Sequence, residues 1–366
     1  MTGLYIHIPW CERKCPYCDF NSHVRPDTIN EEQYISRLVE DFQNEKSLTE
    51  FDVSSVYIGG GTPSLFHAES YRALFTGLGI GYDNEITLEA NPGTIERDDF
   101  ASYQSVGINR VSIGVQSFDP EHLRALGRIH SSQEAKDAIE QATRSGIQAI
   151  NIDLMFGLPN QSIEQALHDL NMAIALDPTH ISWYQLTIEP NTVFGRRPPL
   201  LTSDDYRAEM SERGIDLLAK QGYERYEVSA FAREGQVCKH NVNYWEFGDY
   251  IGIGAGAHGK LTTPNGIQRT RKPKQPDSYL RNSKRMVSEI ATEDLSVEFM
   301  MNALRLKNGV PKQLFTQRTG LCSSVIEETI SELVAEGVMQ PDRLALTEFG
   351  YRHLDFAVGR FLHLDE

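Results

Sequence analysis

The stretch Cys11-Glu-Arg-Lys-Cys15-Pro-Tyr-Cys18 follows directly on the apolar run Leu4-Tyr-Ile-His-Ile8. Thiolates at this spacing can wrap a loop around one face of a [4Fe–4S] cluster, and a closed cluster needs four such ligands. No fourth cysteine lies nearby, because the position two after Cys18 is Phe20. The spacing therefore predicts a cluster on Cys11, Cys15 and Cys18. Its open iron can take an external chelate, such as the amino and carboxylate groups of S-adenosylmethionine.

The other reading of these cysteines is a zinc site, although zinc commonly uses paired C-x2-C elements with further ligands downstream. The chain has 5 cysteines, and an odd number with three crowded together does not fit a secreted disulfide framework. The first residues have no signal-peptide pattern, and no run approaches the roughly 20 apolar residues of a membrane span. We expect a cytoplasmic protein.

Five further apolar or β-branched runs follow the first one, and each ends in polar or Gly-rich residues. They are Val53–Ile58, Glu85–Ala90, Arg110–Gln116, Ala149–Phe156 and Ile181–Leu186. Helical patterns such as Glu32–Glu40 and Gln133–Thr143 lie between them. This alternation predicts an α/β fold with a parallel sheet and crossover helices. Six such units can form a partial barrel or a doubly wound sheet, and the pattern alone leaves both open.

The last part of the chain has a different pattern. Lys272–Asp277 is a Pro-rich basic connection, and predicted helices follow at Val297–Leu306, Pro311–Gln317 and Ser324–Glu336. Two short strands around a turn are expected over 337–347, before a last helix, which suggests a winged-helix-like unit. Such units often bind DNA, but residues 293–366 hold 12 acidic and 7 basic residues in a chain of net charge −16. This charge argues against nucleic-acid binding and against simple docking on anionic lipid.

Several motifs, in order along nearly the whole chain, carry a family resemblance. They are Tyr5-Ile-His-Ile-Pro-Trp-Cys11, Gly59-Gly-Gly-Thr-Pro-Ser64, Glu89-Ala-Asn-Pro92, Gly114-Val-Gln-Ser-Phe118 and Asn151-Ile-Asp-Leu-Met-Phe-Gly-Leu-Pro159. With the three cysteines, they resemble the radical S-adenosylmethionine superfamily and, within it, the oxygen-independent coproporphyrinogen III oxidase family. The oxidases usually carry a further Cys where Phe20 stands. The segment His240-Asn-Val-Asn-Tyr-Trp245 instead resembles the HNxxYW signature of the HemW-type heme chaperones.

The resemblance implies three parts of the chain. A partial (β/α)6 radical S-adenosylmethionine barrel would occupy residues 1–235. The HNxxYW segment, a Gly-rich loop and a basic linker would occupy residues 236–290. A C-terminal winged-helix-like α+β domain would occupy residues 291–366.

The candidate cofactor residues lie at the ends of the predicted strands. Gly59-Gly-Gly61 lets a ligand approach the backbone closely. Ionisable groups within apolar strands are costly to bury unless they are paired or bind a ligand. By resemblance, the residues that contact S-adenosylmethionine are Tyr5, Tyr17, Gly60, Gly61, Thr62 and Glu89. Gln116, Arg128 and Asp153 match positions around a second such molecule in the oxidases, and whether this chain holds a second one is left open.

The HNxxYW segment supplies a candidate heme ligand. Heme iron accepts an imidazole, so His240 is the predicted axial ligand, with Tyr244 and Trp245 as a flat apolar platform. Cys238 and His258 are the alternative ligands, and the absence of a C-x-x-C-H motif argues against c-type attachment. The basic stretch Arg269–Lys274 could meet heme propionates or an acidic partner, or could be a solvated linker.

The resemblance implies a heme chaperone that binds heme as cargo and delivers it to acceptor hemoproteins, membrane-bound respiratory proteins among them. A reductant protein would serve the cluster, and a homodimer is an open alternative to a monomer. We expect no coproporphyrinogen oxidase activity. The competing functions are oxidative decarboxylation of coproporphyrinogen III propionates and radical chemistry on another tetrapyrrole.

Overall fold

The computed structural model describes residues 2–48, 51–81, 83–94 and 98–362. Its centre is a 12-stranded sheet in which six neighbouring strands follow the order β1-β4-β5-β6-β7-β8. These strands are β1 (Thr2–Ile8), β4 (Val53–Gly60), β5 (Glu85–Ala90), β6 (Arg110–Gln116), β7 (Ala149–Phe156) and β8 (His180–Gln185). Every neighbouring pair among them is parallel. The predicted α/β partial barrel is confirmed.

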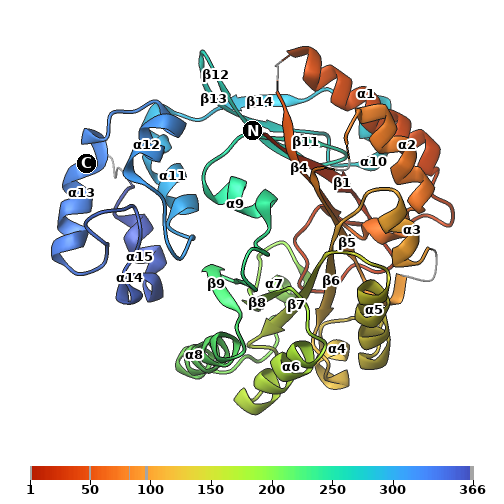
Figure 1. Cartoon of the computed structure of the whole chain (residues 1–366), viewed down its shortest axis with the longest axis horizontal. Helices are drawn as coiled ribbons and strands as arrows, with labels where there is room; N and C mark the ends of the chain where they lie inside the picture. The colour runs from red at the N-terminus through yellow and green to blue at the C-terminus, as the bar shows by residue number, and fades with distance from the viewer. Residues whose placement is uncertain (1, 49–50, 82, 95–97, 363–366) are drawn as a thin grey trace.

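Helices cover the outer, convex face of this curved sheet, as Figure 1 shows. They are α1 (Glu31–Leu48), α2 (Ala68–Leu78), α3 (Phe100–Ser105), α4 (Pro120–Ala125), α5 (Ser132–Arg144), α6 (Ile163–Ala175) and α8 (Asp204–Lys220). The short helix α7 (Val193–Arg196) follows β8 and instead lies against Pro16. Capping boxes fix the starts of two of them, with Ser131 and Glu134 on α5 and Ser162 and Gln165 on α6.

Side-chain alternation divides the strands into a packing face and an inner polar face. On β1, Leu4, Ile6 and Ile8 belong to the main hydrophobic core, whereas Tyr5 and His7 line an inner cavity. On β7, Ile152 is fully buried in the same core, whereas Asp153 lines a second inner cavity. Because successive side chains of a strand point to opposite faces, each strand packs against the helices with one face and lines the inner cavities with the other.

Residues 224–289 extend the sheet at both ends. Strands β9 (Glu224–Glu227) and β10 (Ala230–Ala232) add antiparallel to β8. Strand β11 (Tyr250–Ile253) lies parallel to β1, and β12 (His258–Thr263), β13 (Gly266–Arg271) and β14 (Met286–Glu289) continue from it. Helix α9 (Lys239–Trp245) lies inside the curve of the sheet, and α10 (Pro276–Arg281) precedes β14.

The basic stretch Arg269–Lys274 is part strand and part connection, and Lys272–Asp277 contains no strand. Arg269–Arg271 lies in β13, and Lys272 is buried, with 2% of its surface exposed. Its Nζ lies 2.5 Å from Asp41 Oδ1 and 2.6 Å from Glu45 Oε1, both on α1. A solvated linker is excluded for this lysine, because its charge is neutralised inside the protein.

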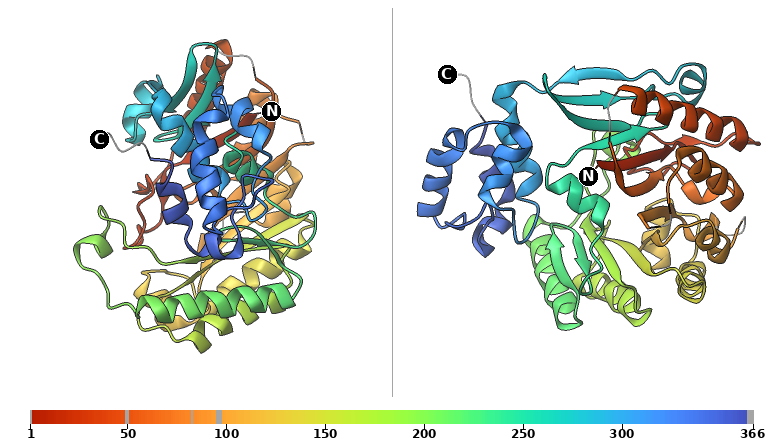
Figure 2. Two further views of the ribbon diagram at one scale, coloured as in Figure 1. Left: turned by 90° about the vertical axis from the view of Figure 1, so that its left-hand side faces the viewer. Right: turned by 45° about the horizontal axis from the view of Figure 1, so that its top comes forward.

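The C-terminal module, described from residue 291 to residue 362, forms a separate lobe beside the barrel (Figure 2). It contains α11 (Leu295–Ala303), α12 (Lys312–Thr319), α13 (Ser324–Ala335), α14 (Glu348–Arg352) and α15 (Leu354–Gly359). An antiparallel bridge joins Met339 to Leu346, as expected for a β-ribbon over 337–347, and a second bridge joins Leu344 to Val310, which precedes α12. The predicted winged-helix-like α+β unit is confirmed.

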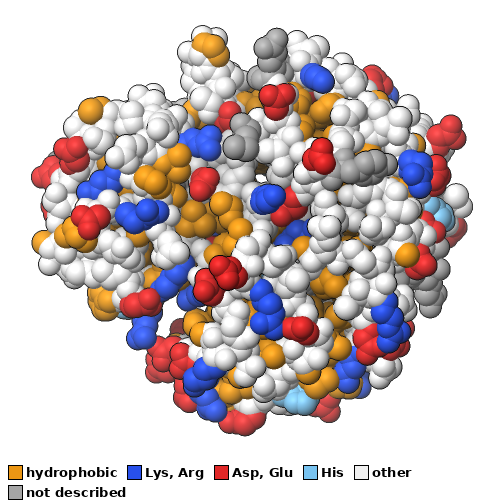
Figure 3. Space-filling model, viewed as in Figure 1, with side chains coloured by type: hydrophobic (Ala, Val, Ile, Leu, Met, Phe, Trp, Pro, Cys, Tyr) orange, Lys and Arg blue, Asp and Glu red, His pale blue; other side chains and the backbone are white. Residues whose placement is uncertain are grey.

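Charged side chains of both signs are spread over the barrel and the C-terminal module on the face seen in Figure 3. Among the described residues, no helix combines the length and apolar character that crossing a bilayer requires.

Candidate functional site

The cysteine loop begins where β1 ends. A two-stranded parallel sheet of β2 (Trp10–Cys11) and β3 (His23–Val24) closes its base. Lys14 joins the start of the loop to its end, because its Nζ donates to the carbonyl oxygens of Phe20 at 3.3 Å and Ser22 at 3.1 Å. Cys15 and Cys18 therefore lie on a loop whose two ends are held together.

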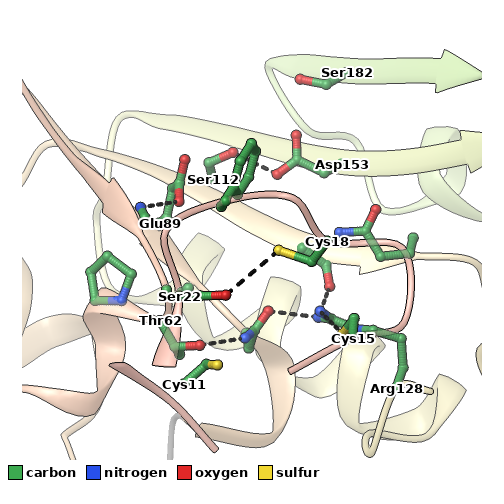
Figure 4. A pocket seen from close by; sticks show the side chains of 18 of the residues that line it. Cys11, Cys15, Cys18, Ser22, Thr62, Glu89, Ser112, Arg128, Asp153 and Ser182 are labelled. Atoms are coloured by element: carbon green, nitrogen blue, oxygen red, sulfur yellow. Dashed lines mark hydrogen bonds between the residues drawn. The ribbon is translucent and has the colours of Figure 1, made fainter. Parts of the chain in front are cut away.

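Polar groups surround the three thiols (Figure 4). Arg128 Nη1 donates to Cys15 Sγ at 3.9 Å, and Cys18 Sγ lies 3.8 Å from Ser22 Oγ. Burial, followed by the neighbouring Cys18, raises the pKa of the Cys11 thiol to about 11. Donors aimed at sulfur favour thiolates, which are the ligands of an iron–sulfur cluster.

A cluster and a single metal ion place different demands on the three cysteines. Within the ranges that the structure describes, no three His, Cys, Asp or Glu side chains converge closely enough to hold one metal ion. A cubane cluster gives each cysteine an iron of its own and keeps the sulfurs apart. The three cysteines and their donors fit a [4Fe–4S] cluster better than they fit zinc.

The cysteines line a cavity of about 320 Å3, here called the cluster cavity, at the carboxyl ends of β4–β8. It brings together most of the residues predicted from the sequence to bind cofactor. These are Cys11, Cys15, Cys18, Tyr17, Gly60, Gly61, Thr62, Glu89, Gln116, Arg128 and Asp153. Tyr5 is not among them and lines the other inner cavity instead.

The glycine turn at the end of β4 has little room for side chains. Gly60 has φ +117°, and a Cβ on it would lie 2.5 Å from the His7 ring. A Cβ on Gly61 would lie 2.4 Å from the Trp10 carbonyl oxygen. Glycine is required at both positions, and the missing side chains leave room for a ligand to approach the backbone.

Glu89 faces this turn from β5. Its Oε1 accepts from Tyr57 Oη at 2.9 Å, and its Oε2 accepts from the Gly60 N–H at 3.1 Å. Burial, followed by the nearby Asp153 carboxylate, raises the pKa of Glu89 to about 7. A carboxylate held at this position can accept from an ammonium group, whose positive charge would offset the cost of ionising Glu89.

Asp153 ends a hydrogen-bonded network on the inner face of β6–β8. Ser112 Oγ donates to Asp153 Oδ2 at 2.8 Å, and Asn151 Nδ2 donates to Asp153 Oδ1 at 2.8 Å. Asn151 Oδ1 in turn lies 2.6 Å from His180 Nδ1. Sequence reasoning missed Ser112, Asn151 and His180. The signal was present, because Asn151 and Asp153 are two apart on one strand and must share a face.

Gln116 and Arg128 form the wall opposite the glycine turn. Gln116 has φ +70° and accepts from Tyr184 Oη at 2.8 Å. Arg128 Nη2 donates to Asn91 Oδ1 at 2.6 Å and to the Gly114 carbonyl at 2.5 Å. With Nη1 on Cys15, this guanidinium is directed at the cysteine loop and the wall.

A second cavity, of about 790 Å3, lies on the other side of the cysteine loop. We call it the aromatic cavity, because its lining includes Tyr5, Phe20, Tyr57, Tyr244, Trp245 and Tyr250. His7, His23, His240 and His258 also line it. Cys18, Phe20, Tyr57 and Glu89 border both cavities, so the two are neighbours with a common wall.

His240 projects from α9 into the aromatic cavity and is 7% exposed. Its Nδ1 lies 3.2 Å from Ser55 Oγ, and its ring centroid lies 5.3 Å from that of Tyr57. Burial lowers the pKa of this imidazole to about 4, which keeps it neutral. With Nδ1 engaged, Nε2 is the nitrogen available to a metal.

The two alternative heme ligands differ in position. Cys238 is 1% exposed, is not part of the cavity lining, and donates to Glu85 Oε1 at 3.7 Å. His258 lines the cavity from the start of β12 and is exposed. The geometry therefore favours a histidine over Cys238.

Two family models match parts of the chain. The radical SAM superfamily model matches residues 5–173, and the HemN C-terminal domain model matches residues 290–352. The first of these regions contains the cysteine loop and the cluster cavity up to Asp153. The second coincides with the C-terminal module.

Full-length relatives and one solved structure extend these matches. The chain is 48% identical to the protein named heme chaperone HemW from Escherichia coli K12, over 98% of both chains. It is 49% identical to the protein of the same name from Haemophilus influenzae Rd, over 98% of this chain and 97% of that one. The structure of Escherichia coli coproporphyrinogen III oxidase (HemN) superposes with a TM-score of 0.82 at 22% identity, covering 98% and 89% of the two chains.

Proposed function

The chain belongs to the HemW family of the radical SAM superfamily, and from this membership we propose that it binds heme and delivers it to acceptor hemoproteins. The observation that carries the proposal is the aromatic cavity, in which a neutral, buried His240 lies among tyrosine and tryptophan rings. A flat apolar macrocycle with one central metal needs such aromatic walls and such a ligand.

In this proposal the iron ligand is His240, acting through Nε2. Ser55 orients the ring by its contact with Nδ1, which fixes the nitrogen that faces the cavity. Tyr57 supports the ring from β4, and Tyr244 and Trp245 supply apolar surface for the porphyrin. No C-x-x-C-H motif is present, so c-type attachment of the heme is not part of this proposal.

The cluster cavity would hold the cofactors that the family implies. Cys11, Cys15 and Cys18 would carry a [4Fe–4S] cluster, and the Gly60–Thr62 turn with Glu89 would bind S-adenosylmethionine. When bound, this pair supplies one-electron chemistry at the sulfonium. Arg128 uses Nη1 and Nη2 on Cys15, Asn91 and Gly114, whereas its Nε has no partner among the described residues.

A heme titration tests the proposal. We expect the cluster-reconstituted chain to bind heme with a histidine-type Soret spectrum and His240→Ala to weaken binding at least tenfold. His258→Ala, on the same cavity but exposed, is the matched control and should change affinity less than threefold. If His258→Ala abolishes binding while His240→Ala does not, the ligand assignment is wrong.

A second assay separates this function from the competing enzyme. With cluster, S-adenosylmethionine, reductant and coproporphyrinogen III under anaerobic conditions, we expect no catalytic formation of protoporphyrinogen. Heme-loaded chain mixed with an apo-hemoprotein should instead transfer its heme. Catalytic decarboxylation in this assay would replace the chaperone proposal.

A further inference from the structure

Two segments pack against Pro16 of the cysteine loop. The Phe194 N–H donates to the Pro16 carbonyl at 2.9 Å, so α7 lies directly on the loop. A Cβ on Gly127 would lie 2.8 Å from Pro16 Cδ, so the turn after α4 also touches it. We call residues 11–20, 120–130 and 189–200 together the cluster rim.

The rim carries arginines that have no partner. Arg13, Arg124, Arg196 and Arg197 are exposed. None of the four guanidinium groups makes a hydrogen bond or ion pair to any residue that the structure describes. The rim contains 6 Lys and Arg and 4 Asp and Glu, which leaves 29 against 47 in the rest of the chain. The rim is therefore an electropositive area on a strongly acidic protein.

Exposed apolar side chains stand among these arginines. Phe20 is 60% exposed, Ile129 58%, Val193 49% and Leu200 79%. A small core beneath them, which includes Leu126, Leu158 and Phe194 with Tyr17 and Leu201, fixes the segments that carry them. Exposed apolar side chains and unpaired arginines on segments that meet at the cysteine loop have the composition of a protein-docking surface.

We propose that the cluster rim is the docking surface of an acidic one-electron carrier protein. The inference rests on the proposed function, because only a cluster behind the loop needs an external electron. The rim frames the loop that carries Cys15 and Cys18, so a protein docked on it approaches the cluster more closely than one docked elsewhere. In the transfer the carrier loses one electron and the cluster gains it, and no bond forms or breaks.

Charge complementarity decides the chemistry of the partner. Two proteins that are both strongly acidic repel each other where acidic surfaces face, whereas the rim has more basic than acidic residues. Unpaired arginines attract an acidic partner to this area, which mainly raises the association rate at low salt. In the complex they pair with its carboxylates. The apolar residues supply contact area once the partner is oriented.

A charge-reversal pair provides the test, with flavodoxin, an acidic flavin-carrying protein, as the probe. R196E/R197E removes two rim arginines, and K220E/K312E is the matched control. Lys220 and Lys312 are exposed, lie outside the rim and have no partner among the described residues. The double substitutions change the net charge equally. We expect R196E/R197E to raise the Kd for flavodoxin at least tenfold at about 50 mM salt and the control to raise it less than threefold.

A second readout uses the reconstituted chain. The rate at which reduced flavodoxin reduces the cluster should fall at least tenfold in R196E/R197E, while reduction by dithionite, which needs no docking, should stay unchanged. Equal losses in the two double variants, or no loss in either, would overturn the proposal. If R196E/R197E loses binding to anionic phosphatidylglycerol vesicles but not to flavodoxin, the rim is a lipid surface and the proposal is wrong. Failure of dithionite to reduce any cluster would count against the proposed function and leave the binding result to stand.

Discussion

At the scale of single residues, the inner face of the barrel is built from polar side chains that satisfy one another. The side-chain Nδ2 of Asn151 donates to Asp153, and its Oδ1 contacts His180 Nδ1. Glu89 accepts from Tyr57 Oη and from the Gly60 N–H. Buried polar groups of this kind cost free energy unless every partner is present. The site is therefore sensitive to changes of one atom in its walls.

Within the glycine turn, Gly61 has less room than Gly60. Alanine there would place its Cβ 2.4 Å from the Trp10 carbonyl, so β2 and the cysteine loop must shift. We expect Gly61→Ala to lower S-adenosylmethionine affinity at least tenfold, measured by equilibrium dialysis on reconstituted chain. Gly81→Ala, where a Cβ meets nothing within 4 Å, is the control and should leave affinity unchanged. Normal binding in both variants would show that the turn can relax.

Asp169 provides a pH-dependent test of the same fold. It is fully buried on α6 and accepts from Ser117 Oγ and the Phe118 N–H, both at 2.7 Å. Burial raises its pKa to about 7, so the folded chain holds a proton that the unfolded chain has lost between about pH 4 and pH 7. Wild-type stability at this site therefore falls as the pH rises through that window.

Asp169→Asn removes that titration. Because one pKa unit corresponds to about 1.4 kcal/mol, the unfolding free energy of the variant relative to wild type should rise by roughly 2 to 4 kcal/mol from pH 4 to pH 8. Urea unfolding at several pH values measures it. Asp205→Asn, at an exposed position on α8, should show no such slope. A flat difference for Asp169→Asn would mean that the carboxyl titrates normally.

At the scale of elements, long periodic segments were predictable and short ones were not. The bounds of β5, β6 and β7 match the predicted runs residue for residue, because each run is apolar and ends in Gly, Pro or a polar residue. Strand β11 was missed because its four residues, Tyr250–Ile253, run into the Gly-rich stretch that follows. Strand β13 was missed because its arginines indicate solvent, and only its pairing with β12 and β14 shows it to be a strand.

Site residues that lie in local motifs were predictable, and those that depend on the folded sheet were not. The cysteines, the glycine turn and Glu89 lie in motifs with local spacing, and they line one cavity as expected. Tyr5 lies on the inner face because its neighbours Leu4 and Ile6 face the helices. The motif does not reveal that it lines the aromatic cavity and not the cluster cavity. Ser112 and His180 depend on which strands become neighbours, which only the folded sheet decides.

The charge cluster that joins α1 to the end of β13 gives a prediction about elements. Lys272 is buried between Asp41 and Glu45, and removing its ammonium leaves two buried carboxylates with fewer partners. We expect Lys272→Met to lower the unfolding free energy by about 3 to 5 kcal/mol. Lys274→Met, exposed two residues later, should cost less than about 0.5 kcal/mol. Chemical denaturation compares them, and equal stabilities would mean that α1 is not anchored through Lys272.

At the scale of the whole molecule, the C-terminal module covers apolar surface of the barrel. Phe247 is 1% and Ile267 3% exposed, and both belong to the hydrophobic core of the module. Arg305 of the module lies 4.4 Å over the Trp245 ring and 3.4 Å from Glu227 Oε2. Trp245 also lines the aromatic cavity, so one residue contacts both the module and the proposed heme site.

A chain that ends at residue 290 should show what this cover contributes. Loss of the module exposes Phe247 and Ile267, and we expect self-association in size-exclusion chromatography together with a lower Tm. Full-length chain cleaved after residue 290 by a specific protease is the control, and its two pieces should stay together. A monomeric truncated chain with unchanged Tm would mean that the module is only loosely attached.

The position of β1 in the sheet affects when this strand can gain its partners during synthesis. Its partners are β4 and β11, and β11 begins at Tyr250, opposite Gly3. The cysteine loop also depends on residues that are synthesised late, because Asn21 Nδ2 donates to the carbonyl oxygens of Ala255 and Lys274. At about 5 to 20 residues per second, a ribosome needs roughly 10 to 50 seconds to supply those partners. The first strand to be synthesised thus gains its β11 partner only late, and the cysteine loop exists before the carbonyl groups that Asn21 contacts.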